Sequence, residues 1–167
     1  MEVTDALTHP DFDRRVSQIE SLLRQVSVII RKRGREILAD FGITPPQLNA
    51  LVILLEDGQI TMGELCDKMY LACSTATDLI DRMERNGLIA RERDQSDRRV
   101  IRLKVLEPGH KVIDEVMKAR KHYLGGVLGQ IPEEEHDMLI KALGDLHKVM
   151  QESEVEQRQD VLAKPFA

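Results

Sequence analysis

The side chains that could do chemistry gather in one basic segment and in the polar stretch just before it. Residues 82–104 hold eight Arg or Lys side chains and four carboxylates, in a chain of 167 residues with 24 basic and 29 acidic side chains. A local positive patch can bind phosphates while the net charge keeps the protein in solution. Ahead of it, short polar side chains of the kind that contact duplex DNA stand at Ser74, Thr75, Thr77 and Asp78. The segment is a candidate nucleic-acid interface; the alternative for its charge is a solvated hairpin that serves solubility.

Other reactive side chains form no catalytic or metal-binding pattern. Cys73 directly precedes an expected helix start, which can activate a thiol, and the alternative is a small buried residue in a turn. His110 and Asp114 stand four residues apart, and two ligands do not make a metal site. There is no nucleophile–base pair and no Gly-rich phosphate loop. We therefore expect no enzyme, no catalytic residues, no metal and no cofactor.

The composition is that of a globular protein, with 42% hydrophobic and 32% charged residues. Its longest apolar run, Ala50 to Leu55, is far shorter than the roughly 18 residues of a membrane span. The first twenty residues are acidic and lack the apolar core of a secretory signal. Aromatic residues make up only 3%, which argues against stacking on single strands. These features predict a cytoplasmic protein with reduced thiols and no membrane partner.

Three short helices are expected between residues 43 and 86. Thr44 and Thr61 are good N-cap residues, and Gln47 and Glu64 complete their capping boxes three positions later. Ser74 is the expected N-cap of the third helix, whose apolar side chains share one face: Ala76, Leu79, Ile80 and Met83. Asn86-Gly87 is a typical helix end.

The hydrophobic period then changes from that of a helix to that of a strand. Residues 89–93 and 99–105 alternate as two strands around the polar turn 94–97. Two short helices followed by a basic hairpin predict a winged helix-turn-helix, whose second helix enters the major groove. Its outward side chains would be Ser74, Thr75, Thr77, Asp78, Asp81, Arg82 and Arg85, with Arg98 and Arg99 at the hairpin tip for a minor groove. Asp81 could instead form a helix-surface ion pair with Arg85.

Longer amphipathic helices flank this unit. Helical spacing of apolar residues predicts them from Asp11 to Phe41, from Pro108 to Gln130, and from Glu133 to about Glu152. The expected fold is therefore mainly α with a small β wing. The polar residues beyond the last helix are expected to fray.

Three fragments, in order and at matching spacings, resemble the MarR family of transcriptional regulators. The likeness covers about residues 12 to 150. The similar fragments are Thr44-x-x-Gln47-Leu48-x-x-Leu51, then Ser74-Thr75-Ala76-Thr77-Asp78-Leu79-Ile80-Asp81-Arg82-Met83-Glu84-Arg85-Asn86-Gly87-Leu88-Ile89 as recognition helix and exit, and Arg91 with Asp94-x-x-Asp97-Arg98-Arg99, Leu103, Val105 and Gly109 as wing. One departure is Leu106, which stands where the family has a Thr that opens the next helix.

The resemblance implies a homodimer with four regions in each chain. These are an N-terminal dimerisation helix (1–42), a winged helix-turn-helix DNA-binding domain (43–106), C-terminal dimerisation helices (107–155) and a tail (156–167). The apolar stripes of the flanking helices agree, since the small winged domain cannot cover them all. A two-fold dimer implies a pseudo-palindromic operator in double-stranded DNA with half-sites about one turn, ~10 bp, apart.

The resemblance also implies a repressor, released by a small aromatic or anionic effector. Arg82 and the Ser74–Thr77 turn would contact the major groove, and Asp97 would orient Arg99 by a charge-assisted bond. Arg31 or Arg35, beside Gly34, could meet an anion; the effector pocket is otherwise not placed. Two alternatives stay open: a winged-helix protein-interaction module without specific DNA binding, and a regulator that senses oxidants through Cys73.

Overall fold

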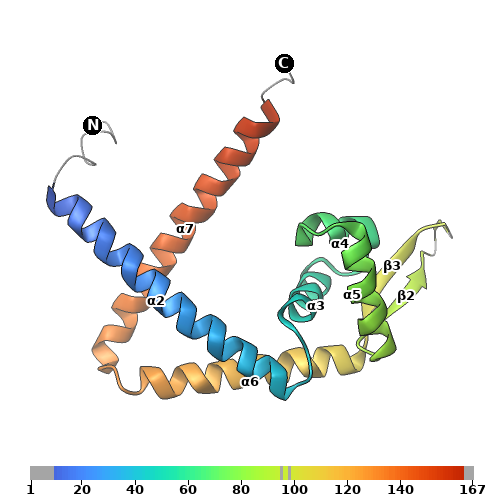
Figure 1. Cartoon of the computed structure of the whole chain (residues 1–167), viewed down its shortest axis with the longest axis horizontal. Coiled ribbons are helices and arrows are strands. Elements are labelled where there is room, and N and C mark those ends of the chain that lie inside the picture. The colour runs from blue at the N-terminus through green and yellow to red at the C-terminus, as the bar shows by residue number, and fades with distance from the viewer. Residues whose placement is uncertain (1–9, 95, 98, 164–167) are drawn as a thin grey trace. The chain divides into compact units, whose positions relative to one another are not determined.

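The computed structural model describes residues 10–94, 96–97 and 99–163. In chain order the elements are α2 (Pro10–Asp40), α3 (Pro45–Asp57), β1 (Ile60–Thr61), α4 (Met62–Met69), α5 (Cys73–Arg85), β2 (Ile89–Arg93), β3 (Ile101–Val105), α6 (Glu107–Leu128) and α7 (Glu133–Ala163) (Figure 1). The predicted class, mainly α with a small β wing, is confirmed. The chain divides into two compact units, residues 1–120 and 121–167, which are described separately.

The first turns of α3 and α4 are fixed by the side chains that the sequence indicated. Gln47 Oε1 accepts hydrogen bonds from the Thr44 N–H (2.8 Å) and the Thr44 hydroxyl (3.1 Å). Thr61 Oγ1 accepts from the Glu64 N–H (3.3 Å), and the Glu64 carboxylate accepts from the Thr61 N–H (2.7 Å). The Thr61 N–H and the Thr61 hydroxyl (2.8 Å) both donate to the Glu64 carboxylate and so hold the pKa of Glu64 below its ordinary value. These caps position the first helices of the winged domain.

A three-stranded antiparallel sheet lies at the edge of this domain, in the order β1-β3-β2. The hairpin pairs Ile89 with Val105 and Arg93 with Ile101. Strand β1 was not predicted; its two residues pair with Leu103 and Arg102 of β3. The sheet therefore ties the wing to the loop that precedes α4.

The core of the first unit lies between α3, α4, α5, β3 and the first half of α6. Its fully buried side chains are Leu38, Leu51, Leu65, Ile80, Met83, Ile89, Leu103 and Val116. Removing this much apolar surface from water is the main stabilising contribution of the domain. Helix α5 contributes one face to this core, and its opposite face is exposed to solvent.

Helix α2 contributes little to this core. Only Ile37 and Leu38, near its end, are buried. Its remaining large apolar side chains are exposed: Phe12, Val16, Ile19, Leu22, Leu23, Val26, Val28, Ile29 and Ile30. An exposed apolar stripe of this length on one helix marks an interaction surface.

In the second unit, α7 carries a similar exposed stripe: Met138, Leu139, Ile140, Leu143, Val149 and Met150. The helix continues to Ala163, so it includes residues of the segment that we expected to fray. The unit also holds His136, whose Nε2 lies 3.1 Å from the Leu128 carbonyl across the turn between α6 and α7.

Across the described ranges, no helix by itself has the length and apolar composition needed to cross a membrane. Helices α2 and α3 reach that length and apolar composition only when they are counted as one segment, and the chain bends by 85° between them.

Candidate nucleic-acid interface

Helix α5 begins two residues earlier than an N-cap at Ser74 would place it. Its first residue is Cys73 and its N-cap is Ala72, which has no side-chain cap. The expectation that Ser74 caps this helix is therefore wrong: Ser74 lies inside the first turn, two residues past the N-cap. The connection between α4 and α5 is short, and its first residue, Tyr70, is left-handed at φ 53°.

The missing cap leaves the start of α5 open to an outside acceptor. The Ala76 N–H makes the first helical bond, to the Ala72 carbonyl (3.1 Å). The amides of residues 73–75 thus have no intrahelical partner. An uncapped helix start of this kind offers N–H donors and a favourable dipole to a phosphate.

The predicted contact side chains of α5 share its exposed face. Ser74, Thr75, Thr77, Asp78 and Arg82 are all exposed, whereas Ala76, Leu79, Ile80 and Met83 are buried on the other side. Two of them are partly tied to the helix: the Thr77 hydroxyl donates to the Cys73 carbonyl (2.7 Å), and Arg82 Nε donates to the Asp78 carbonyl (3.3 Å). The terminal guanidinium nitrogens of Arg82 make no ion pair within the described part of the chain. This face of the helix therefore combines the Arg82 cation with several short polar groups.

Asp81 does not pair with Arg85, contrary to one reading of the sequence. Its carboxylate accepts a bond from Arg91 of strand β2 (Asp81 Oδ1 to Nη2, 2.6 Å). The other arm of the same guanidinium binds Glu84 (Nη1 to Oε2, 2.6 Å), and the Arg91 N–H also donates to Glu84 (3.1 Å). Arg85 Nε instead donates to the Asp81 carbonyl (3.3 Å). Arg91 thus joins strand β2 of the wing to the second half of α5. The sequence alone did not predict this contact.

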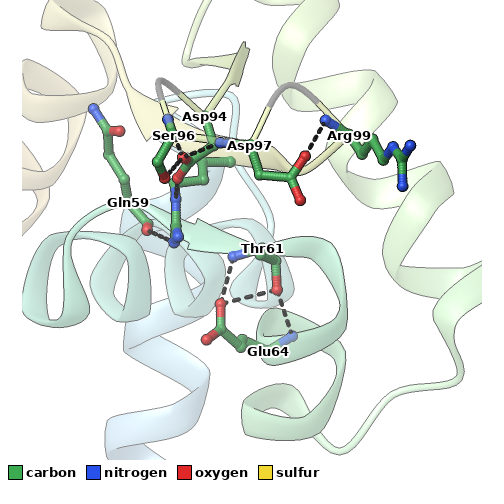
Figure 2. A network of polar contacts seen from close by, with 8 residues as sticks. Gln59, Thr61, Glu64, Asp94, Ser96, Asp97 and Arg99 are labelled. Atoms are coloured by element: carbon green, nitrogen blue, oxygen red, sulfur yellow. Dashed lines mark hydrogen bonds and ion pairs between the residues drawn. The ribbon is translucent and has the colours of Figure 1, made fainter.

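The turn of the wing is organised by Asp94 (Figure 2). Its Oδ1 accepts from the N–H groups of Ser96 (2.8 Å) and Asp97 (3.1 Å) and from the Ser96 hydroxyl. Its Oδ2 pairs with Arg102 Nε, and Arg102 Nη1 reaches the Gln59 carbonyl (3.0 Å). The Ser96 hydroxyl and the Arg102 guanidinium hold the pKa of Asp94 well below its ordinary range. One carboxylate therefore joins the wing turn to the loop before β1.

Asp97 orients the backbone of Arg99 rather than its guanidinium. Asp97 Oδ1 accepts from the Arg99 N–H at 2.9 Å, and the Arg99 side chain extends away from the carboxylate in Figure 2. The expected charge-assisted bond is present, but to the amide, because an Asp side chain reaches the N–H two residues on without ordering a long side chain. Arg99 is exposed and its guanidinium makes no ion pair within residues 10–94, 96–97 and 99–163. Arg98 lies outside the described residues.

Asp94→Asn should lower the free energy of unfolding at neutral pH, and the loss should shrink in acid. The pKa of Asp94 is depressed in the folded chain, so its charge stabilises the fold above the ordinary value, about 3.9. That contribution is lost as the pH falls from about 4 towards the folded pKa. Urea unfolding at pH 7 and pH 3 measures both. Asp114→Asn, an equal charge change on α6, is the control; an Asp94→Asn deficit that stays constant with pH would contradict the assignment.

The redox candidate occupies a different place from the one expected. Cys73 is exposed and is the first residue of α5, so the alternative of a small buried residue is wrong; Cys66, in α4, is buried. No group of three or more potential metal ligands occurs within the described ranges. Leu106 takes the position before α6, where its N–H donates to the Leu88 carbonyl (2.9 Å).

Comparison with known proteins identifies this arrangement. The MarR family model matches residues 43–101. YsmB of Bacillus subtilis, an uncharacterized HTH-type transcriptional regulator, is 47% identical over 135 residues, which are 81% of this chain and 92% of YsmB. The HTH-type transcriptional repressor MdtR of the same organism is 30% identical over 149 residues, 89% of this chain and 94% of MdtR. The structure of a MarR family protein from Bacillus stearothermophilus, 49% identical, superposes with a TM-score of 0.76 over 83% of this chain and 97% of its own. The chain therefore belongs to the MarR family of HTH-type transcriptional regulators.

Proposed function

We propose that the chain is a homodimeric, sequence-specific repressor that binds a pseudo-palindromic operator and is released by a small-molecule effector. The observation that carries this proposal is the outward face of α5. It combines an uncapped helix start with the exposed side chains of Ser74, Thr75, Thr77, Asp78 and Arg82. Helix amides bind phosphates, and Arg with short polar side chains reads bases in the major groove.

The wing supplies the second contact in this proposal. Arg99 is exposed beside a turn that Asp94 and Asp97 hold in shape, so its guanidinium is free to enter a minor groove or meet a phosphate. Arg93, on the last position of β2, is likewise exposed and without an ion pair in the described part of the chain. Arg98, adjacent in sequence to Arg99, would add a further positive charge to this contact.

The exposed stripes on α2 and on α7 support the homodimer. Each is long and apolar, and within its own unit neither is covered. A second copy of the chain would bury the same stripes on both partners, as a two-fold interface requires. The two recognition helices would then be spaced for half-sites about one helical turn, ~10 bp, apart.

An anionic effector is the class that best fits the free basic side chains of the first unit. Arg31 and Arg35 flank Gly34, and Arg120 Nη2 lies 3.7 Å from the point where a Cβ would project from Gly34. None of the three arginines makes an ion pair in the described chain. An effector that binds two dimer geometries with different affinity would shift the population between them and so change operator affinity.

In-vitro selection tests the function directly. The purified protein is mixed with random duplexes at physiological salt, and bound sequences are amplified. We expect a pseudo-palindrome with half-sites about one turn apart. Enrichment of nothing above background by a folded dimer, even after a screen of small aromatic acids, would favour the protein-interaction module instead.

Two arginine substitutions separate the roles of helix and wing. Arg82→Ala should weaken binding to the selected duplex by ten-fold or more and weaken random DNA less, because a base contact typically contributes about 1–3 kcal/mol of discrimination. Arg99→Ala should weaken binding and lower the slope of log affinity against log salt by about one, because it removes a groove or phosphate contact. Fluorescence anisotropy at several salt concentrations measures both. An equal loss on operator and random DNA for Arg82→Ala would reassign that residue to backbone positioning.

A further inference from the structure

Arg102 lies in the middle strand of the sheet and bonds to two segments that are far apart in the sequence. In β3 it pairs with Thr61 of β1 on one side and with Glu92 of β2 on the other. Its guanidinium donates from Nε to the Asp94 carboxylate in the wing turn, and from Nη1 to the Gln59 carbonyl (3.0 Å) in the loop before β1 (Figure 2). One planar group therefore connects the wing turn to the segment that leads into the helix-turn-helix.

The wing turn is held in shape by hydrogen bonds among its own residues. The Asp94 N–H donates to the Val100 carbonyl (2.9 Å), and the Val100 N–H donates to the Asp97 carbonyl (2.9 Å). Asp94 Oδ1 accepts from the Asp97 N–H (3.1 Å), and Asp97 Oδ1 accepts from the Arg99 N–H (2.9 Å). The described residues of this turn thus form one hydrogen-bonded unit that includes Arg99.

The contribution of Arg102 is therefore to the orientation of this unit relative to the rest of the domain. The carboxylate that it binds is well enclosed, with 12% of the Asp94 side chain exposed. A hydrogen bond between two ionised groups is roughly twice as strong as one between neutral groups, and the guanidinium fixes the directions of its donors. Without Arg102, the turn would be connected to the sheet only through the backbone at the ends of β2 and β3.

We propose that Arg102 is a positioning residue for operator binding, which fixes the wing turn through Asp94 and so places the Arg99 guanidinium for its DNA contact. The proposal rests on the DNA-binding function proposed above, in which Arg99 enters a minor groove or meets a phosphate. Arg102 itself does not touch the DNA in this proposal, because Asp94 matches its charge. Its effect on affinity therefore depends on the presence of the Arg99 side chain.

A double-mutant cycle with Arg99→Ala tests whether Arg102 acts through Arg99. The probe is the duplex recovered by selection, and affinity is measured at several salt concentrations. Arg102→Met should weaken binding about ten-fold in the wild-type background and less than about two-fold in the Arg99→Ala background, where no guanidinium is left to position. The slope of log affinity against log salt should fall by about one for each single variant, and by no more than that for the double variant.

Lys104→Met is the matched control. Lys104 is a cation of the same strand, and its ion pair is with Glu92 of the neighbouring strand (3.1 Å) rather than with the turn. Its removal should change affinity by the same factor in both backgrounds. Arg102→Lys should recover only part of the affinity, because an ammonium group cannot reproduce the planar pair of donors. Equal losses for Arg102→Met in the two backgrounds, or unchanged affinity, would overturn the proposal.

Nuclear magnetic resonance of the full-length protein without DNA tests the tie itself. In Arg102→Met, the backbone amides of Asp97 and Arg99 should show lower heteronuclear Overhauser effects than in wild type, while those of β3 stay unchanged. Unchanged values at Asp97 and Arg99 would mean that the turn is held without Arg102, contrary to the proposal. The two possible failures are distinguishable. If the proposed function is wrong, wild type binds no duplex, whereas if only this proposal is wrong, wild type binds and Arg102→Met shows no coupling to Arg99.

Discussion

Gly109→Ala should lower the free energy of unfolding by about 2 kcal/mol or more, although alanine favours helices. A Cβ at this position would lie 2.4 Å from the Leu88 carbonyl oxygen, 2.8 Å from Val105 Cγ1 and 3.3 Å from Leu51 Cδ2. Overpacking of a filled site typically costs 1–3 kcal/mol, and here the nearest atom belongs to the backbone. The gain in helix propensity, about 1 kcal/mol, offsets only part of that cost.

The Leu88 carbonyl cannot move aside without further loss. It accepts the Leu106 N–H (2.9 Å), while the Leu88 N–H donates to the Met83 carbonyl (3.0 Å) at the end of α5. A shift at Leu88 therefore disturbs the start of α6 and the end of the recognition helix together. Operator affinity should fall with stability for this reason.

Urea unfolding at one fixed protein concentration measures the loss, since the proposed dimerisation would make stability depend on concentration. Gly63→Ala is the matched control, because its Cβ would have only Thr61 Oγ1 nearby, at 4.0 Å. That variant should be as stable as wild type or up to about 1 kcal/mol more stable. If the Gly109→Ala protein is as stable as the Gly63→Ala protein, the atoms around Gly109 can shift to accommodate a Cβ at little cost in free energy, and the prediction is wrong.

The local part of the fold could be predicted from the sequence because its signals lie within a few residues. Thr44 with Gln47 and Thr61 with Glu64 form the expected caps, and Gly87, at φ 68°, ends α5 as Asn86-Gly87 indicated. Strand β1 could not be predicted. Two residues carry no periodicity, and Ile60–Thr61 is a strand only because β3 lies beside it.

The candidate site was predicted less completely than the fold. The exposed face of α5 followed from helical periodicity, but the start of α5 did not, because Ser74 is a better cap by type than Ala72, the residue that is the N-cap. Asp81 has two possible cations, and only Arg85 is near it in sequence. The partner that binds its carboxylate, Arg91, is ten residues away and comes close only when the hairpin folds back onto α5. Asp97 bonds the Arg99 amide, a local pattern that Asp two residues before an N–H could have indicated.

Arg91→Met should weaken operator binding by ten-fold or more without changing its salt dependence. The Arg91 side chain is 26% exposed, and its guanidinium joins β2 to Asp81 and Glu84 of α5. Although burial acts to lower the pKa of Arg91, its bonds to Asp81 and Glu84 outweigh burial and raise that pKa. Methionine keeps much of the apolar stem but leaves two carboxylates facing each other. The wing and the recognition helix then lose the contact that fixes their relative position, and unfolding should become easier by about 1–2 kcal/mol.

The salt dependence distinguishes this positioning role from a DNA contact. Arg91 is neutralised by two carboxylates, so it has no charge left over for a phosphate, and the slope of log affinity against log salt should match wild type. Arg93→Met removes the same charge from the same face of β2 without breaking an ion pair in the described chain. It should leave stability unchanged, and any loss of affinity should come with a shallower slope. Arg91→Lys should recover only part of the binding, because an ammonium group cannot reproduce the two-armed contact that joins Asp81 and Glu84. A shallower slope for Arg91→Met would instead mean that Arg91 leaves its carboxylates to meet the DNA.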